Sequence, residues 1–489
     1  MSLTSRVLDL EPVADLAAYE AAGGGRALQV ALEGGGDPVL AVLEASGLRG
    51  RGGAGFPTHR KWRSILDGLV PGASPVVVVN GAEGEPGSIK DRTLLRSNPY
   101  RTIEGALVAA LVIGADTVVV ATKAAFGREV ARLRSAVAEI AASDDWPGIA
   151  IDIVEGPDAY LFGEETALLE VVEGREPFPR IAPPWRRGID DPSGDPAQPL
   201  AIDEGPEDEA GVLSEPTLVN NVETFAHVAQ IVANGPEWFR SVGTADSPGT
   251  IVCTVVGDVP RPGVAEVAMG TPLREVLEQV GGVRRIDEVR AVLPGVSAPM
   301  VGPDGLDTPL TYEDMTSLGS GLGSAGFIVV GAQTSPLAVA AGASRFLAVE
   351  SCGQCTPCKQ DGLSIASSLE RLCRGEAGPK ERRDVEDRLR TIDRGARCYL
   401  ATQHLQVVSG LLEAFPEEVA AQERPGAESI EPALVAELVD IAVGPEGPEA
   451  HWDERQRDKQ PDWGYGVDSG EAPADRIDQH DASAATPTS

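Results

Sequence analysis

A chain of 489 residues with a formal net charge of −34 is too acidic to bind nucleic acid, because phosphate backbones require concentrated Lys and Arg. Hydrophobic residues make up 42% of the chain, enough to fill several cores, and a chain of this length is expected to form roughly two to four domains. No stretch of the sequence is apolar over the length needed to cross a bilayer. The chain starts without a secretory signal, which predicts a cytoplasmic protein whose partners are proteins or small molecules.

A glycine-rich run, GLRGRGGAGFPT, occupies residues 47–58 and follows an N-terminal segment of residues 1–44. Such a loop lets backbone N–H groups close on a phosphate, and a helix that begins near Pro57 would add its positive end. Lys61 would supply a point charge. A linker is the alternative, but the flanking Arg51 and Phe56 favour phosphate or dinucleotide binding.

From residue 75 onward, short β-branched runs alternate with amphipathic stretches, which is typical of a parallel sheet with helical crossovers. We expect strands at residues 75–79, 117–121 and 149–155, and helices at residues 102–113, 129–141, 164–172 and 220–232. Residues 45–246 are therefore predicted to form an α/β domain.

Polar loops follow these elements at positions where α/β folds bind ligands. The loop NGAEGEPG, residues 80–87, comes directly after a buried strand and carries Asn80, Glu83 and Glu85. Acids suit ribose hydroxyls or a heterocycle better than a phosphate, and an ordinary acidic turn is the alternative. Two helix starts, residues 158–166 and 216–224, add further polar groups, although each alone is only a well-capped helix start.

The composition changes again near residue 247. Strands at residues 250–257, 289–293 and 326–331 with a helix at residues 272–280 predict a small mixed domain over residues 247–335. Helical periodicity at residues 366–372, 382–392 and 402–415 predicts a helical bundle over residues 336–425. Residues 188–215 are expected to be a solvated acidic excursion, and residues 426–489 a mostly disordered acidic tail.

Three thiols stand at two-residue intervals in the run ESCGQCTPCK, residues 350–359. Cys352, Cys355 and Cys358 can hold three corners of a cubane iron–sulfur cluster, and Cys398 is the natural fourth ligand. Cys373 is the alternative fourth ligand. A structural zinc site is disfavoured because zinc frameworks usually pair their ligands as two separated couples. The remaining thiol, Cys253, lies in an apolar run and is expected to be a small buried hydrophobe.

The four loops and the cysteine triplet, in this order, resemble the flavin-containing NADH-oxidising subunit (the 51-kDa or F subunit) of respiratory complex I. The related diaphorase subunits of NAD-linked hydrogenases and formate dehydrogenases share these motifs. The resemblance covers about residues 45–415 and is carried by RGRGGAGFPT, YLFGEETAL, NNVET and SCGQCTPC. It implies a Rossmann-like FMN-binding domain, a β-grasp-like (SLBB) domain and a helical domain with a [4Fe–4S] cluster.

The resemblance also implies roles for single residues. FMN would be held by Gly50, Arg51, Gly52, Lys61, Asn80, Tyr160, Gly163, Glu164, Asn220, Asn221 and Thr224. The NAD(H) site would be lined by Gly53, Phe56, Glu83, Glu85, Glu165 and Trp185, with Glu83, Glu85 and Glu165 as the catalytic carboxylates. The cluster would be bound by Cys352, Cys355, Cys358 and Cys398.

Several residues depart from the family pattern. They are Ala82, His59 and Ser64 near the first two loops, Phe162 beside the expected flavin, and Ala182 and Trp185 in the run RIAPPWR. A Trp still stacks a base, but loss of a cation and of an aromatic is expected to weaken dinucleotide binding.

Three functions are compatible with these motifs. The first is an NADH-oxidising electron-input subunit that passes electrons through FMN and a [4Fe–4S] cluster to other iron–sulfur subunits, and reaches a membrane only through them. The second is an electron-transfer module with the same cofactors that exchanges electrons with a redox protein instead of NADH. The third is a zinc-stabilised scaffold with a vestigial flavin site.

Overall fold

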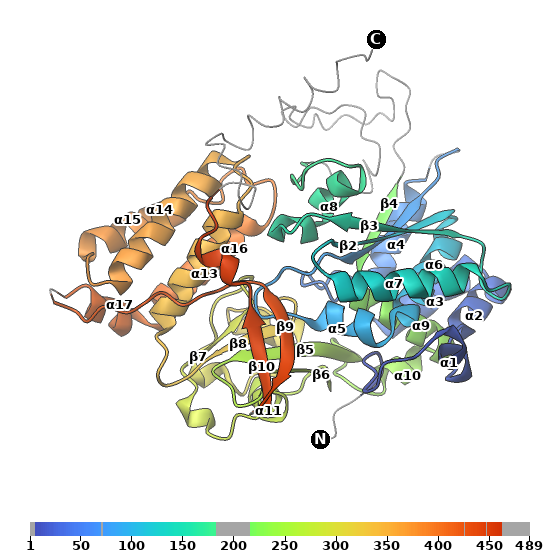
Figure 1. The fold of residues 1–489 in the computed structure, drawn as a ribbon, viewed down its shortest axis with the longest axis horizontal. Coiled ribbons are helices and arrows are strands. Elements are labelled where there is room, and N and C mark those ends of the chain that lie inside the picture. The colour runs from blue at the N-terminus through green and yellow to red at the C-terminus, as the bar shows by residue number, and fades with distance from the viewer. Residues whose placement is uncertain (1–4, 70–71, 182–215, 425, 446, 462–489) are drawn as a thin grey trace, which may run out of the picture.

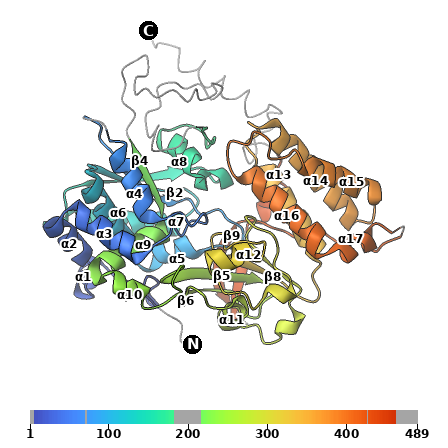
Figure 2. The same ribbon diagram turned by 180° about the vertical axis from the view of Figure 1, so that it is seen from behind.

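The computed structural model describes residues 5–69, 72–181, 216–424, 426–445 and 447–461. These residues form an α/β unit, a middle unit and a helical unit, which pack against one another (Figures 1 and 2). The acidic excursion, Ala182 and Trp185 lie outside the described residues. Within those ranges no helix is both long enough and apolar enough to cross a membrane.

A four-stranded parallel sheet in the order β3-β2-β1-β4 is the frame of the α/β unit. Its strands are β1 (Val76–Gly81), β2 (Thr117–Lys123), β3 (Ala150–Gly156) and β4 (Thr217–Asn221). Alternate side chains of β1 enter different cores: Val77 and Val79 pack with the crossover helices, and Val78 packs with Leu168 of α8. The crossovers are α5 (Lys90–Ser97), α6 (Pro99–Ile113), α7 (Gly127–Ala141), the 3₁₀ turn η1 (Tyr160–Gly163), α8 (Glu165–Val172) and α9 (Val222–Asn234).

Sequence reasoning missed β4 and the first three helices, whereas α4 (Thr58–Asp67) begins next to Pro57, where a helix start was expected. The helix expected at residues 220–232 starts only at Val222, because the preceding five residues pair with β1. The segment of residues 1–44 is not separate: α1 (Leu16–Ala21), α2 (Arg26–Gly34) and α3 (Gly36–Ser46) share the main core, with Leu28 and Leu43 buried. Two further helices, α4 (Thr58–Asp67) and α10 (Pro236–Arg240), complete this layer.

The middle unit contains a four-stranded mixed sheet in the order β6-β5-β8-β7. The strands are β5 (Thr250–Gly257), β6 (Gly263–Ala268), β7 (Ala291–Pro294) and β8 (Gly326–Val330), accompanied by α11 (Leu273–Gln279), α12 (Tyr312–Ser317) and the 3₁₀ turns η2 (Ile286–Glu288) and η3 (Pro303–Gly305). The sheet and α11 enclose a core of their own, in which Cys253 is buried as expected.

The helical unit is a bundle that carries the cysteine loop. It comprises α13 (Pro336–Glu350), α14 (Thr356–Cys373), α15 (Pro379–Leu389), α16 (Leu400–Ala414) and α17 (Pro416–Gln422). The Lys359 ammonium donates hydrogen bonds to the carbonyl oxygens of Ala348, Val349 and Ser351, at 2.8–3.2 Å. This side chain therefore ties the cysteine loop to the end of α13.

The prediction of a disordered tail is wrong for its first part. Strands β9 (Leu438–Gly444) and β10 (Gly447–Trp452) pair as an antiparallel hairpin, followed by the 3₁₀ turn η4 (Glu454–Arg457). The hairpin crosses in front of the middle unit toward α5 and α7 (Figure 1), where Asp440 pairs with Arg96 of α5 and Arg128 of α7. The segment also reaches the helical unit, because Lys459 pairs with Glu350 at 2.6 Å. The polar composition of the segment serves these ion pairs rather than solvation.

Candidate functional site

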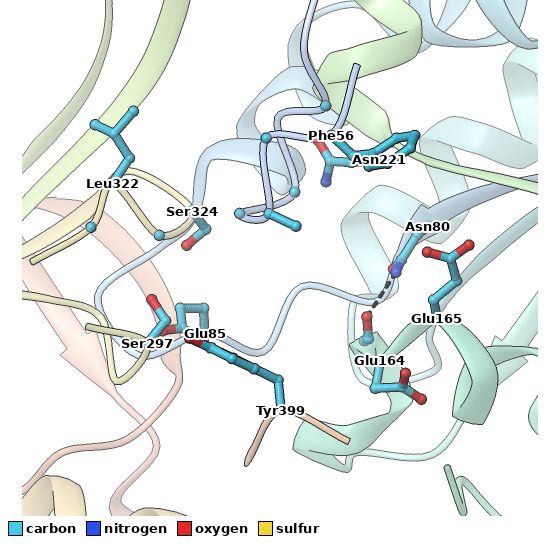
Figure 3. Close-up of a pocket in the computed structure, with 18 of the residues that line it drawn as sticks. Phe56, Asn80, Glu85, Glu164, Glu165, Asn221, Ser297, Leu322, Ser324 and Tyr399 are labelled. Atoms are coloured by element: carbon cyan, nitrogen blue, oxygen red, sulfur yellow. Dashed lines mark hydrogen bonds between the residues drawn. The ribbon is translucent and has the colours of Figure 1, made fainter. Parts of the chain in front are cut away.

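A cavity of about 800 Å³ opens where the three units meet. The carboxyl ends of β1 and β4 and the glycine-rich loop of residues 49–56 form one side of the cavity (Figure 3). The loops of residues 297–298 and 320–324, from the middle unit, form the opposite side, and the start of α16 lies between the two sides. The volume lies within the range of cofactor sites.

The glycine-rich loop is shaped for close approach of a ligand. A Cβ on Gly52 would lie 3.2 Å from Asn221 Cβ, and one on Gly55, whose φ is +62°, would lie 2.5 Å from the Tyr312 ring. The backbone N–H groups of residues 52–56 donate to no other described residue. They are therefore available to an anion, as the sequence predicted.

Arg51 has a different place from the one predicted. Its guanidinium is buried and points away from the cavity, donating to the carbonyl oxygens of Thr250 at 3.0 Å and Pro248 at 3.2 Å. Its backbone N–H donates to Thr224 Oγ1 at 2.8 Å. Arg51 thus joins the glycine-rich loop to the middle unit, and Gly50, Gly52 and Gly53 remain along the cavity.

Lys61 and Glu165 meet across the cavity wall. The Lys61 ammonium lies 2.6 Å from Glu165 Oε1, and both side chains are partly exposed to the cavity. Phe56 stands at the edge with about half of its surface exposed, so its ring is free to stack on a planar ligand. These residues are the cation, the acceptor and the aromatic surface that a nucleotide cofactor requires.

Two of the predicted carboxylates serve mainly as helix caps. Glu83 accepts hydrogen bonds from the backbone N–H groups of Asp91 and Arg92 at 3.2 Å, at the start of α5. Glu164 accepts from the N–H groups of Thr166 and Ala167 at the start of α8. Both line the cavity, but their oxygens are already engaged in capping.

Glu85 connects all three units. Its carboxylate accepts from Tyr160 Oη and from the Val296 N–H, both at 2.7 Å, and Tyr160 Oη in turn accepts from Gln403 Nε2 at 3.0 Å. Burial raises the pKa of Glu85, although the hydrogen bonds from Tyr160 and Val296 act in the opposite direction and lower it. Val296 and Gln403 carry no signal in the sequence, because their contacts arise only from the packing of distant units.

The predicted asparagines brace the loops around the cavity. Asn80 Nδ2 donates to the Gly163 carbonyl at 2.8 Å, and Asn220 Oδ1 accepts from the Trp62 indole at 2.9 Å. Asn221 Nδ2 donates to Asp91 Oδ2 at 2.6 Å. All three line the cavity and keep part of their amide available.

A buried charge cluster that sequence reasoning missed lies behind these asparagines. The Lys90 ammonium pairs with Asp91 at 2.8 Å and Glu223 at 2.9 Å. Burial is the largest influence on Asp91 and raises its pKa to about 7. Lys90 lowers the pKa of Glu223 to about 2 against the opposing effect of burial. Asp91 itself lines the cavity.

The departures from the family pattern have different positions. Ala82 lines the cavity and is buried. Phe162 is fully buried against Leu168 and supports the loop from behind. Ser64 and His59 do not line the cavity; the Ser64 hydroxyl donates to the Lys61 carbonyl within α4.

A second, smaller pocket is lined by all four predicted cluster ligands, Cys352, Cys355, Cys358 and Cys398. Cys352 and Cys358 are buried, and burial raises the pKa of the Cys352 thiol to about 12. Such thiols deprotonate when a metal cluster offsets the charge. Cys373 lies fifteen residues beyond Cys358 on α14, roughly 22 Å along the helix at 1.5 Å per residue. It is too distant to be a ligand of the same cluster.

The two pockets share a wall. Leu161, Cys398 and Leu400 line both the large cavity and the four-cysteine pocket. A cofactor in the cavity and a cluster on the cysteines would therefore be separated by little more than one layer of side chains. A glycine-rich anion loop beside a four-cysteine pocket is the arrangement expected of an iron–sulfur oxidoreductase that binds a phosphate-bearing cofactor.

The comparisons with known proteins agree with this class. Residues 43–230 match the Nuo51 FMN-binding domain, residues 252–300 the SLBB domain, and residues 338–422 the NADH-ubiquinone oxidoreductase-F iron-sulfur binding region. The cofactors implied by these matches, FMN and a [4Fe–4S] cluster, fit the anion loop and the four thiols described above.

Relatives cover most of the chain. The second of two NADH-quinone oxidoreductase F subunits of Rhizobium meliloti (strain 1021) is 39% identical over 383 residues, 76% of this chain and 85% of the relative. The F subunit of the same enzyme in Mycobacterium bovis (strain ATCC BAA-935 / AF2122/97) is 35% identical over 434 residues, 85% of this chain and 92% of the relative. The chain therefore belongs to the family of NADH-quinone oxidoreductase F subunits.

A solved structure has the same fold. A chain of the NAD⁺-reducing [NiFe]-hydrogenase in the H₂-reduced state superposes with a TM-score of 0.70 at 30% identity. The superposition covers 86% of this chain and 68% of that chain.

Proposed function

We propose that this chain oxidises NADH as the electron-input subunit of a larger redox complex. When bound, FMN supplies the conversion between two-electron and one-electron chemistry, and a [4Fe–4S] cluster supplies one-electron transfer. The observation that carries the proposal is the wall of Leu161, Cys398 and Leu400, which is common to the cavity and the four-cysteine pocket. Electron transfer between the two sites then needs no movement of the chain.

The FMN would be held on the α/β side of the cavity. The free N–H groups of residues 52–56 and the Lys61 ammonium are suited to its phosphate. Asn80, Asn220, Asn221, Thr224, Tyr160 and Gly163 would border the flavin ring and ribityl chain, with Arg51 and Glu164 holding these loops in position. The set combines many hydrogen-bonding groups with the Lys61 cation, as a noncovalent flavin requires.

NADH would occupy the rest of the cavity. Phe56 offers a stacking surface at the entrance, and Glu85 and Glu165 offer acceptors for ribose hydroxyls and the nicotinamide amide. The Glu85 carboxylate is held by Tyr160 and Val296, so its position is fixed before the ligand binds.

Partner iron–sulfur subunits would take the electrons onward. Cys355 and Cys398 are half-buried, whereas Cys352 and Cys358 are buried, so the four-cysteine pocket is not fully enclosed. We propose a cytoplasmic location, with any membrane reached only through these partners.

Anaerobic titration of the purified protein with NADH tests the function. NADH is expected to bleach the flavin absorbance to the same extent as dithionite does in an untreated sample. If dithionite bleaches the flavin and saturating NADH does not, the chain is a relay fed by a redox protein. If no visible flavin or iron–sulfur absorbance is present in anaerobically purified protein, the zinc-scaffold hypothesis gains support.

A further inference from the structure

A second glycine-rich loop faces the first one. Residues 320–324, with the sequence SGLGS, connect α12 to β8 in the middle unit and line the cavity (Figure 3). A Cβ built on Gly53 of the first loop would lie 3.7 Å from the carbonyl carbon of Gly323 and 4.0 Å from the Ser324 nitrogen. The two loops therefore meet at one edge of the cavity.

The second loop presents unused hydrogen-bond donors. The N–H groups of Ser320 and Ala325 donate to Met315 and Leu322, but those of residues 321–324 donate to no residue in the described part of the chain. Ser324 Oγ is buried and likewise lacks a partner among the described residues. Buried donors are normally satisfied, so the buried Ser324 hydroxyl without a partner, together with four adjacent unused N–H groups beside a cavity, indicates a ligand.

The backbone of this loop is held in an uncommon conformation. Gly323 has φ +52°, and Ala325, at φ +58°, is the one non-glycine residue in the described ranges with a positive φ. A Cβ on Gly323 would collide with Ser297 Oγ, so glycine is required there. Strain of this kind is retained where function uses it, and successive amides in such turns form anion-binding concavities.

The charges of the cavity restrict what the loop can bind. The side chains that line it include five carboxylates, Glu83, Glu85, Asp91, Glu164 and Glu165, and two cations. Of the cations, Lys61 is paired with Glu165 and Arg49 with Glu313. An anionic group on the side of the middle unit must therefore be met by backbone N–H groups.

We propose that residues 321–324 form a subsite for the pyrophosphate of the dinucleotide, with Ser324 Oγ and the four free N–H groups donating to phosphate oxygens. The inference rests on the proposed NADH oxidation and extends it, because it assigns a substrate contact to the middle unit. The subsite recognises phosphate oxygens and not the base. A ligand without phosphate gains nothing from it.

Binding of ADP-ribose to the full-length FMN-loaded protein, measured by calorimetry, tests the subsite. Ser324→Ala is expected to weaken binding roughly tenfold, the value of a hydrogen bond to a charged group, and Ser324→Asp roughly a hundredfold. Ser320→Ala is the matched control on the same loop, because its hydroxyl already donates to the Pro299 carbonyl at 2.6 Å. We expect a change below about twofold for this variant.

Reduced nicotinamide riboside, which has no phosphate, separates the possible outcomes. Its oxidation rate at limiting concentration should be equal in wild type and Ser324→Asp, and both should retain full FMN content. Wild-type affinity of Ser324→Asp for ADP-ribose would overturn the subsite while leaving NADH oxidation intact. Loss of FMN from Ser324→Asp would assign the loop to the flavin phosphate and overturn it as well. If the wild type binds neither ADP-ribose nor NADH, the proposed function itself fails.

Discussion

Lys61→Ala is the most direct test of how the cavity holds its cofactor. Lys61 is a cation on the α/β side of the cavity, its side chain is only 16% exposed, and it lines the same cavity as the glycine-rich loop of residues 52–56. A charge-assisted hydrogen bond to a phosphate contributes about 1.5–3 kcal/mol, so the FMN dissociation constant should rise roughly tenfold to 150-fold.

The ion pair with Glu165 makes the test sharper. In Lys61→Ala the Glu165 carboxylate loses its partner at 2.6 Å and adds a negative charge near the phosphate site. Glu165→Gln in the same chain should therefore recover part of the lost affinity, about 0.5–1.5 kcal/mol of coupling in a double-mutant cycle. Independent effects of the two substitutions would mean that the pair seen here does not persist when FMN binds.

The assay is quenching of FMN fluorescence on titration of the deflavinated protein. Arg63→Ala is the matched control, because it removes the same charge from the same helix at an exposed position outside the cavity. Wild-type FMN affinity in Lys61→Ala, with the control also unchanged, would refute the assignment of the phosphate to this loop.

Three further predictions concern the cluster, the helical unit and the hairpin. Cys398→Ser should lose most of its iron, whereas Cys373→Ser should keep wild-type iron and sulfide content. Burial lowers the pKa of His404 to about 3, so its neutral form stabilises the fold above pH 6.5 and this stability is lost as the pH falls below that value. Between pH 7.5 and about pH 5.5, the free energy of unfolding of the wild type should fall by about 1.4 kcal/mol more than that of His404→Gln. Glu437→Gln removes the nearer of the two carboxylates that pair with the buried Lys123 ammonium and leaves Asp158 at 3.5 Å, so it should lower the free energy of unfolding in urea by about 2–4 kcal/mol.

Each of these has an outcome that contradicts it. Iron lost from Cys373→Ser and retained in Cys398→Ser would reverse the assignment of the fourth ligand. Parallel stability curves of wild type and His404→Gln between pH 7.5 and 5.5 would show that His404 is already solvated. Glu449→Gln, at an exposed position on β10, is the control for the hairpin, and equal stability losses in both Glu variants would remove the ion pair from the explanation.

The α/β class and the middle and helical units could be predicted because their signals are local. The run of valines in β1 and the apolar periodicity of α6 are each contained within about fifteen residues. The hairpin could not be predicted this way. Asp440 on β9 and Glu437, which directly precedes β9, are polar in sequence, and only their ion pairs with the distant Arg96 and Lys123 give them a structural function. Strand β4 was missed because its last two residues, Asn220 and Asn221, are also typical of a helix start.

The site was predictable as a set of loops but not as a set of contacts. Glycine density, the adjacent asparagines and the cysteine spacing each point to backbone approach or metal binding on their own. The capping function of Glu83 and Glu164 and the inward turn of Arg51 depend on partners that are decided by tertiary packing. Ser324 carried no signal, because a serine between small residues is indistinguishable from an ordinary turn until its hydroxyl is found buried without a partner.

The arrangement of Glu85 explains why the cavity needs three units rather than one. Its carboxylate is fixed by Tyr160 from the α/β unit and by Val296 from the middle unit, while Gln403 from the helical unit orients Tyr160. Tyr160 and Cys398 line the same cavity. Cys398 lies five residues before Gln403 in the sequence. The helix that follows the fourth cysteine thus also orients the tyrosine that holds Glu85. A displacement of α16 would alter Glu85 and the surroundings of Cys398 at once, so under the proposed function a single packing interface would set the geometry of both hydride entry and electron exit.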